Sequence, residues 1–181
     1  MKLISKLEDT EYRYTKTTHE RIAVRAIVIN QENKIALLKV IRDDDDFGPG
    51  NYYETPGGGL EDNEDFIQGV KREVEEEIGY KSSFIQEIGI IEDYYNAIYR
   101  KNINCYYLLK AEEKTNQHFI SYGDLFIKDV VWVSVDDAIS LYENMNKTKI
   151  ERLVRNRELP ILKIVKEILG GMNYVKESDN K

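Results

Sequence analysis

The sequence is poor in several features that would point to other classes of protein. Its 181 residues include one cysteine, Cys105, which excludes an internal disulfide, and no cluster of Cys and His residues suggests a zinc site. No apolar run has the length of a membrane span, and neither end has the pattern of a signal peptide. We therefore expect a soluble, cytoplasmic protein from a reducing compartment.

The sequence also lacks any excess of positive charge. Its 33 acidic residues outnumber its 26 Lys and Arg residues, which gives a formal net charge of -7. An acidic surface repels polyanions at long range and does not attract DNA, RNA or an anionic membrane. We therefore expect neither a membrane nor a nucleic-acid partner. A small anionic ligand would need a metal ion, a local cation or aimed backbone N–H groups.

Strand patterns and amphipathic helices alternate along the chain. Runs rich in β-branched residues predict strands, the first two forming a hairpin, over 21–29, 34–41, 52–54, 83–91, 97–109 and 130–133. The spacing of apolar residues predicts helices over 64–78, 136–145 and 160–169, the last with Pro160 in its first turn. Four aspartates and a Gly-Pro-Gly run predict a loop over 42–50. This order predicts an α/β fold with helices layered around a mixed sheet.

The ends of the chain differ from its middle. Residues 1–20 are polar and weakly patterned, which predicts an arm or an edge strand. Residues 21–170 have the length and patterning of a single domain. Residues 171–181 are predicted to be a frayed tail. Cys105 lies inside a strand pattern, so we expect it to be buried and without a redox role.

The helix predicted over 64–78 carries three carboxylates on one side. At about 100° per residue, Glu77 lies about 40° and Glu76 about -60° from Glu73, whereas Glu75 points nearly the opposite way. Their sector borders an apolar stripe formed by Ile67, Val70, Val74 and Ile78. A solvated acidic face would explain the helix alone equally well. A hard divalent cation would explain why like charges gather beside a buried surface.

A run of glycines lies directly before this helix. Pro56 is followed by Gly57, Gly58 and Gly59, and residues without a Cβ let the backbone approach an anion closely. Glycine-rich segments that lead into helix N-termini often bind phosphate groups. Such a run is common in turns and means little alone. Joined to the acidic helix, it supplies both halves of a site for a metal ion and a diphosphate.

The stretch from Gly58 to Tyr80 resembles the Nudix box, the sequence motif of the Nudix hydrolase family. The motif fixes seven positions, and all of them match here: Gly58, Glu64, Arg72, Glu73, Glu76, Glu77 and Gly79. Tyr80 replaces the usual final aliphatic residue, and Asn63 stands where glycine is frequent. Asn tolerates left-handed backbone angles, so the turn can form. The resemblance implies a Nudix-type α/β/α sandwich with a central mixed β-sheet.

The resemblance implies a pyrophosphohydrolase that cleaves the diphosphate linkage of a small nucleotide, such as a nucleoside triphosphate or a dinucleotide. Glu73, Glu76 and Glu77 would hold Mg²⁺ or Mn²⁺, and Glu73 or Glu76 would take the proton of the attacking water. Arg72 would orient Glu73. The glycine run and Tyr53, the aromatic residue three positions before Pro56, would contact the substrate.

Several points stay open on the sequence alone. Relatives often use a further acidic residue outside the motif, and the candidates here are Asp124, Asp129, Glu112 and Glu113. The alternative function is a non-catalytic Nudix-like nucleotide sensor, but such proteins usually lose the motif glutamates that this chain keeps. A purely structural domain would show no response to metal. The substrate, the number of metal ions and the oligomeric state, a homodimer included, are not determined.

Overall fold

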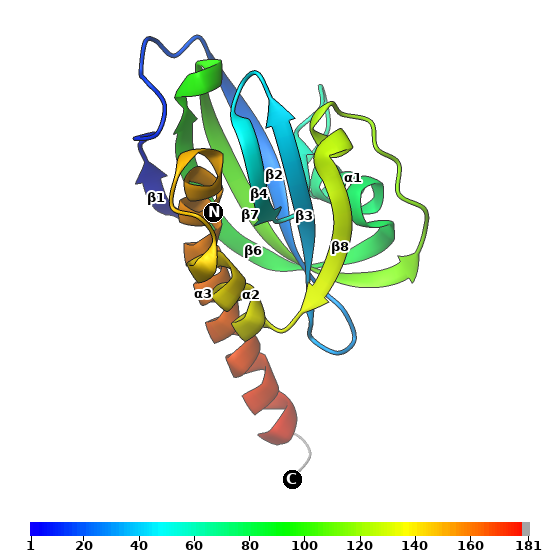
Figure 1. Ribbon diagram of the computed structural model, residues 1–181. Coiled ribbons are helices and arrows are strands. Elements are labelled where there is room, and N and C mark those ends of the chain that lie inside the picture. The colour runs from blue at the N-terminus through cyan, green and yellow to red at the C-terminus, as the bar shows by residue number, and fades with distance from the viewer. Residues whose placement is uncertain (179–181) are drawn as a thin grey trace.

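The computed structural model describes the backbone of residues 1–178 and the side chains of residues 1–171. The described residues form eight strands: β1 (Leu3–Leu7), β2 (His19–Ile29), β3 (Ile35–Asp44), β4 (Gly48–Glu54), β5 (Gly57–Gly59), β6 (Tyr80–Tyr95), β7 (Arg100–Lys114) and β8 (Ile127–Val133). The helices are α1 (Phe66–Ile78), α2 (Val135–Asn144) and α3 (Lys149–Ser178), with 3-10 turns η1 (Asn96–Ile98) and η2 (Gly123–Phe126). Figure 1 shows α1 on one side of the sheet and α2 with α3 on the other, which confirms the predicted α/β/α sandwich.

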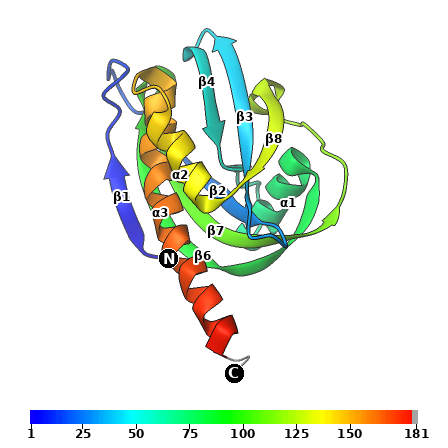
Figure 2. The same cartoon turned by 60° about the horizontal axis from the view of Figure 1, so that its bottom comes forward.

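The sheet is mixed and divides into two halves. Strands follow the order β1-β6-β7-β2-β3-β4, with β1–β6 and β2–β7 parallel. The predicted hairpin is present, because β2 and β3 pair at Ile29 and Ile35. Beyond this point β2 pairs with β5, whereas β3 pairs with β4 and β8. Figure 2 shows β3 and β4 turning away from β2 and β7.

The apolar core lies on both faces of the sheet. On one face, Val70, Val74 and Ile78 of α1 are buried, as the predicted apolar stripe requires. On the other face, α3 buries residues at helical spacing along its length, among them Ile150, Val154, Ile161, Leu162 and Val165. Cys105 is buried in β7, in agreement with the sequence-based expectation.

The predicted loop over 42–50 is wrong, because most of it is a hairpin. Arg42 pairs with Gly50, and Asp44 pairs with Gly48, so strand pairing continues up to the turn formed by residues 45–47. Asp44 Oδ1 accepts hydrogen bonds from the backbone N–H groups of Asp46 and Phe47, both at 3.0 Å. The same carboxylate forms an ion pair with Arg42. The Asp44 side chain thus stabilises a tight turn within a stretch that the sequence pattern predicts to be an irregular loop.

The helix predicted over 160–169 begins too late. α3 begins at Lys149, and Pro160 lies inside it rather than in its first turn. The first part of α3 is rich in charged residues, so the helical spacing of its apolar residues is difficult to recognise in the sequence. These residues, Ile150, Leu153 and Val154, are all buried. The α3 backbone continues to Ser178, and residues 179–181 of the predicted frayed tail lie outside the described residues.

The N-terminal segment packs onto the rest of the fold. β1 lies parallel to β6, and Tyr12 donates a hydrogen bond to the carbonyl of Phe47 at 2.8 Å. Asp9 Oδ2 accepts the backbone N–H of Asn96 at 2.7 Å, and Glu11 accepts that of Lys149 at 2.6 Å. These contacts join residues 9–12 to the turn between β3 and β4, to η1 and to the start of α3. None of the described helices is long and apolar enough to cross a membrane.

Candidate active site

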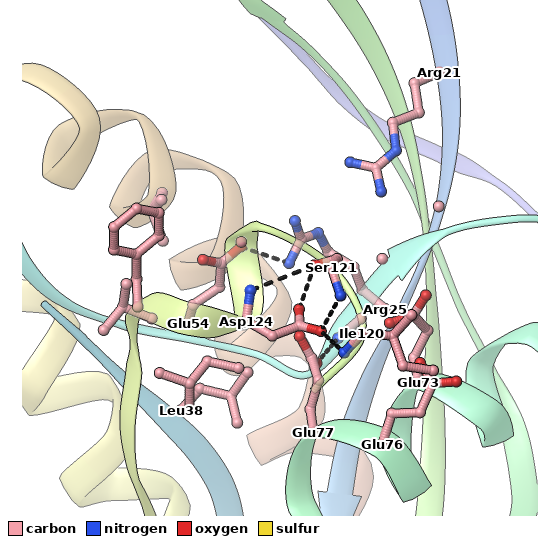
Figure 3. Close-up of a pocket in the computed structure, with 18 of the residues that line it drawn as sticks. Arg21, Arg25, Leu38, Glu54, Glu73, Glu76, Glu77, Ile120, Ser121 and Asp124 are labelled. Carbon is pink, nitrogen blue, oxygen red and sulfur yellow. Dashed lines mark hydrogen bonds and ion pairs between the residues drawn. The ribbon is translucent and has the colours of Figure 1, made fainter. Parts of the chain in front are cut away.

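A cavity of about 360 Å³ lies where the two halves of the sheet diverge. Most of its walls come from α1, β2, β3, β4 and β5, and from the segment that precedes β8 (Figure 3). Individual residues of β6, β7, β8 and α3 complete them. The predicted residues that line it are Gly57, Gly58, Gly59, Arg72, Glu73, Glu76 and Glu77. The fold therefore brings the glycine run and the acidic helix face to one place.

Local sequence signals fix the position of α1. The carboxylate of Asp65 caps its N-terminus by accepting the N–H groups of Ile67 and Gln68, both at 2.9 Å. Gly79 ends the helix with φ of 69°, a left-handed conformation that suits glycine. Asn63 adopts φ of 65° in the preceding turn, as its tolerance of such angles suggests. The helix is thus held at both ends, with its acidic face toward the cavity.

Arg72 connects the carboxylates of this face. Its Nε and Nη2 donate to the two oxygens of Glu64 at 2.9 and 3.0 Å, a bidentate pair. Its Nη1 donates to Glu73 Oε1 at 2.9 Å and to Glu76 Oε2 at 3.1 Å. A further bond from Nη2 to the carbonyl of Gly59, at 3.1 Å, ties the helix to β5. Arg72 therefore holds Glu73 and Glu76 in defined orientations.

Burial raises the pKa of all three glutamates that face the cavity. Desolvation is the main cause for Glu73 and Glu76, and the Arg72 guanidinium opposes it by lowering each pKa. The pKa of Glu77 is raised furthest, first by burial and then by the charge of Glu73. The N–H of Gly57 partly offsets this shift by donating to Glu77 Oε2 at 2.6 Å. The cluster thus concentrates negative charge where water screens it poorly.

The donor chemistry fits a hard divalent cation. Glu73, Glu76 and Glu77 each use one carboxylate oxygen in the hydrogen bonds described above, and the other oxygen accepts none from the residues that the structure describes. Carboxylate oxygens are the ligands that Mg²⁺ and Mn²⁺ prefer. Among the described residues, no three His, Cys, Asp or Glu side chains are already arranged around a single metal position. Arg72 instead bridges Glu73 and Glu76.

Asp124 is the one of four suggested acidic residues that lines the cavity. Its carboxylate accepts the N–H groups of Ile120 and Ser121 at 2.9 and 2.7 Å, which closes the turn before β8 (Figure 3). Its charge also contributes to the raised pKa of Glu73, Glu76 and Glu77. The other three suggested residues are exposed: Glu112, Glu113 and Asp129.

Tyr53 does not line the cavity, whereas its neighbour Tyr52 does. Successive side chains of β4 point to opposite faces, so only one of the two can face inward. Tyr53 lies half-buried beneath Lys39, whose Nζ is 5.7 Å from the centre of the ring. The suggested substrate contact of Tyr53 therefore has no support in its position.

Arginines that the motif does not include form another part of the cavity wall. Arg25 forms an ion pair with Glu54 at 2.8 Å, close to the buried pair Arg157 and Glu158 of α3. Arg21 and Arg100 also line the cavity. The sequence could have indicated two of these arginines. Arg21 and Arg25 are the charged residues in the otherwise apolar stretch 21–29, and their spacing of four places both side chains on one face of the strand.

The fold and the cavity define a Nudix-type protein, and comparison with known families agrees. The model of the NUDIX domain matches residues 19–154, which is most of the chain. The chain belongs to the Nudix family.

Individual relatives are distant. Nudix hydrolase 6 of Arabidopsis thaliana is 26% identical over 145 residues, a match that covers 80% of this chain and 50% of that protein. The chain thus spans half the length of this relative. A NUDIX hydrolase from Nitrosomonas europaea has a TM-score of 0.61 and 20% identity, covering 84% of this chain and 90% of that one. The NUDIX domain of Shewanella oneidensis NrtR, solved with ADP ribose, has a TM-score of 0.59, 16% identity and the same coverages. At these identities the structures show a shared fold.

Proposed function

We propose that the chain is a metal-dependent hydrolase that cleaves the diphosphate linkage of a nucleoside-diphosphate derivative. The observation that carries this proposal is the shared cavity of Glu73, Glu76, Glu77 and the glycines of β5, in which each glutamate has one oxygen that accepts no hydrogen bond from the described residues. The relative from Arabidopsis thaliana is named a Nudix hydrolase. The NrtR domain was solved with ADP ribose, itself a nucleoside-diphosphate derivative, which supports a ligand of this class.

The polar residues and glycines at the acidic side of the cavity have the following parts in the proposed reaction. When bound, Mg²⁺ or Mn²⁺ would neutralise phosphate charge and acidify the attacking water. Arg72 keeps Glu73 and Glu76 oriented, and one of these two accepts the proton of that water. The absence of side chains at Gly57–Gly59 lets the diphosphate approach the backbone of β5. Asp124 adds a carboxylate from outside the motif, fixed by its own turn.

The test compares wild type with Glu77→Gln, using Glu75→Gln as a matched control on the same helix. Glu75 does not line the cavity, and both changes remove one carboxylate charge from α1. Product release is measured with EDTA, Mg²⁺ or Mn²⁺ from nucleoside triphosphates, ADP-ribose, dinucleoside polyphosphates and 5′-triphosphorylated RNA. We expect metal-dependent cleavage of at least one class, a fall in kcat of about 10²-fold or more in Glu77→Gln, and near wild-type rates in Glu75→Gln.

The alternative function, a nucleotide sensor, predicts a different result. A sensor would bind a compound from the panel, detected by calorimetry, without releasing product under any metal condition. Equal rates in Glu77→Gln and wild type would instead show that hydrolysis occurs without the proposed ligand set. The presence of Glu73, Glu76 and Glu77 together in the cavity favours the hydrolase.

A further inference from the structure

Four arginines besides Arg72 line the cavity, and their charges are not equally compensated. Arg25 is paired with Glu54, and Arg42 is paired with Asp44. Arg21 and Arg100 have no hydrogen-bonding or ion-pair partner among the residues that the structure describes, and Arg100 Nε is buried without one. Two guanidinium groups therefore face the cavity with their donors unused.

Arg21 and Arg100 occupy neighbouring positions on one face of the sheet. Arg21 of β2 pairs in register with Asn102 of β7, two residues from Arg100, and residues two apart share a face. Arg21 lies directly over β5, since a Cβ placed on Gly59 would be 2.7 Å from its Nη2. Figure 3 shows Arg21 on one side of the cavity and Glu73, Glu76 and Glu77 of α1 on the other.

The protein alone compensates these two charges only in part, through Glu73 and Glu54 near Arg21 and through the ring of Tyr95, 5.8 Å from the Arg100 guanidinium. Burial lowers the pKa of Arg21, and the nearby Arg25 lowers it further. Burial likewise lowers the pKa of Arg100 to about 10, with Arg21 as the next cause. Desolvated guanidinium groups that repel each other are unfavourable unless an anion binds to them. Planar guanidinium donors match the oxygens of a phosphate particularly well.

We propose that Arg21 and Arg100 bind a phosphate group of the substrate that lies beyond the linkage being cleaved. The inference rests on the proposed function and narrows it. The preferred substrates are polyphosphate compounds, such as nucleoside triphosphates, over nucleoside diphosphates joined to a neutral sugar. A neutral group placed there would leave both desolvated guanidinium groups without a counter-charge, which disfavours its binding.

A competing explanation is that both arginines merely offset the acidic residues of α1 at a distance. It predicts that losing either arginine changes the rates with all substrates alike. Lys101→Gln is a suitable control, because Lys101 adjoins Arg100 in β7 but lies on the other face, paired with Glu20 at 2.8 Å. It removes one positive charge one residue away and leaves the cavity unchanged.

The first measurement is the ratio of kcat/KM for a nucleoside triphosphate to kcat/KM for a nucleoside-diphosphate sugar. We expect Arg21→Gln and Arg100→Gln each to lower this ratio about tenfold or more, mainly by raising KM for the triphosphate, since a hydrogen bond to a charged group is lost. Lys101→Gln should keep the wild-type ratio. An unchanged ratio in both arginine variants would overturn the proposal.

The second measurement tests anion binding by Arg21 and Arg100 independently of hydrolysis. Binding of inorganic tripolyphosphate is measured by calorimetry at low ionic strength in EDTA, where no metal-dependent turnover occurs. Wild type and Lys101→Gln should bind, and the two arginine variants should bind at least about tenfold more weakly. If no nucleotide is cleaved but this pattern holds, the proposed function fails and the anion site stands. If wild type does not bind, or all proteins bind alike, the anion site is wrong.

Discussion

Gly57 and Gly58 are adjacent in β5, but the space beside each is filled by different atoms. A Cβ on Gly57 would lie 2.2 Å from the carbonyl oxygen of Val24, and the φ of 147° at this residue is unfavourable for other amino acids. A Cβ on Gly58 would lie 2.5 Å from Glu73 Oε1, which belongs to the movable end of a side chain. One glycine is thus required by the backbone and the other by the active site.

We expect Gly57→Ala and Gly58→Ala to fail in different ways. Gly57→Ala should lower the free energy of unfolding by about 1–3 kcal/mol, because a backbone clash and a strained φ must be accommodated. Gly58→Ala should lower kcat/KM at least about tenfold with a smaller loss of stability, because it displaces Glu73. Urea unfolding and steady-state kinetics measure the two effects. Full activity in a stable Gly58→Ala protein would contradict the close fit of Glu73 against β5.

At the residue scale, the sequence predicts those residues of the site that lie within one continuous motif. Spacing within the motif located Arg72 and the three glutamates, because one helix turn determines which of its side chains are neighbours. Asp124 could be suggested but not singled out, and Arg21 was not suggested. Both come from segments far from the motif, and only the folded sheet brings them to the same cavity.

α3 carries an ionic network into the interior of the fold. Arg157 is 1% exposed and Glu158 is fully buried. Glu158 Oε1 lies 2.6 Å from Arg157 Nη2 and 3.6 Å from Arg25 Nη1. Its other oxygen accepts the N–H of Thr55 at 2.8 Å and the hydroxyl of Tyr142 at 2.5 Å. The helix is thereby tied to β2, α2 and the segment just before β5.

We expect Glu158→Gln to destabilise the protein by about 3–5 kcal/mol, because buried arginines would lose their negative partner. The matched control is Glu167→Gln, which removes the same charge at an exposed position of the same helix and should change stability by about 0.5 kcal/mol or less. Thermal and urea unfolding give both values. A Glu158→Gln protein as stable as this control would mean that the network adds little to stability.

At the element scale, sequence patterns located most strands and helices but misjudged α3. Pro160 suggested a helix start, since proline is favoured in a first turn and unfavourable further along. The buried charges of Arg157 and Glu158 looked like surface residues, because charged side chains are seldom buried unless they are paired. Their partners, Arg25 and Glu54, lie more than 100 residues away along the chain. No local pattern contains that information.

At the scale of the whole molecule, a net charge of -7 conceals a cavity with two electrostatic sides. One side carries the carboxylates of α1 and Asp124, and the other carries Arg21 and Arg100. The composition predicts an acidic protein. The motif predicts the fold and the acidic side of the cavity. The other side depends on the pairing of β2 with β7, which is a property of the assembled sheet.

We expect the acidic side to make the stability of the whole protein depend on a divalent cation. Burial, followed by the charges of nearby carboxylates, raises the pKa of Glu73, Glu76 and Glu77, and Arg72 offsets the shift only in part for the first two. Their ionised forms are therefore less favourable in the folded state than in water. A cation that binds the folded protein alone should stabilise it by about 2.7 kcal/mol at one hundred times its Kd.

Thermal unfolding in EDTA, Mg²⁺ and Mn²⁺ measures this dependence. We expect Tm to rise with either metal in wild type and in Glu75→Gln, and to rise much less in Glu77→Gln. Without metal, Glu77→Gln should be at least as stable as wild type, because it removes one buried charge from a repulsive cluster. If Glu77→Gln gained as much Tm from metal as Glu75→Gln, the metal would bind elsewhere, and the assignment of the motif glutamates as its ligands would be wrong.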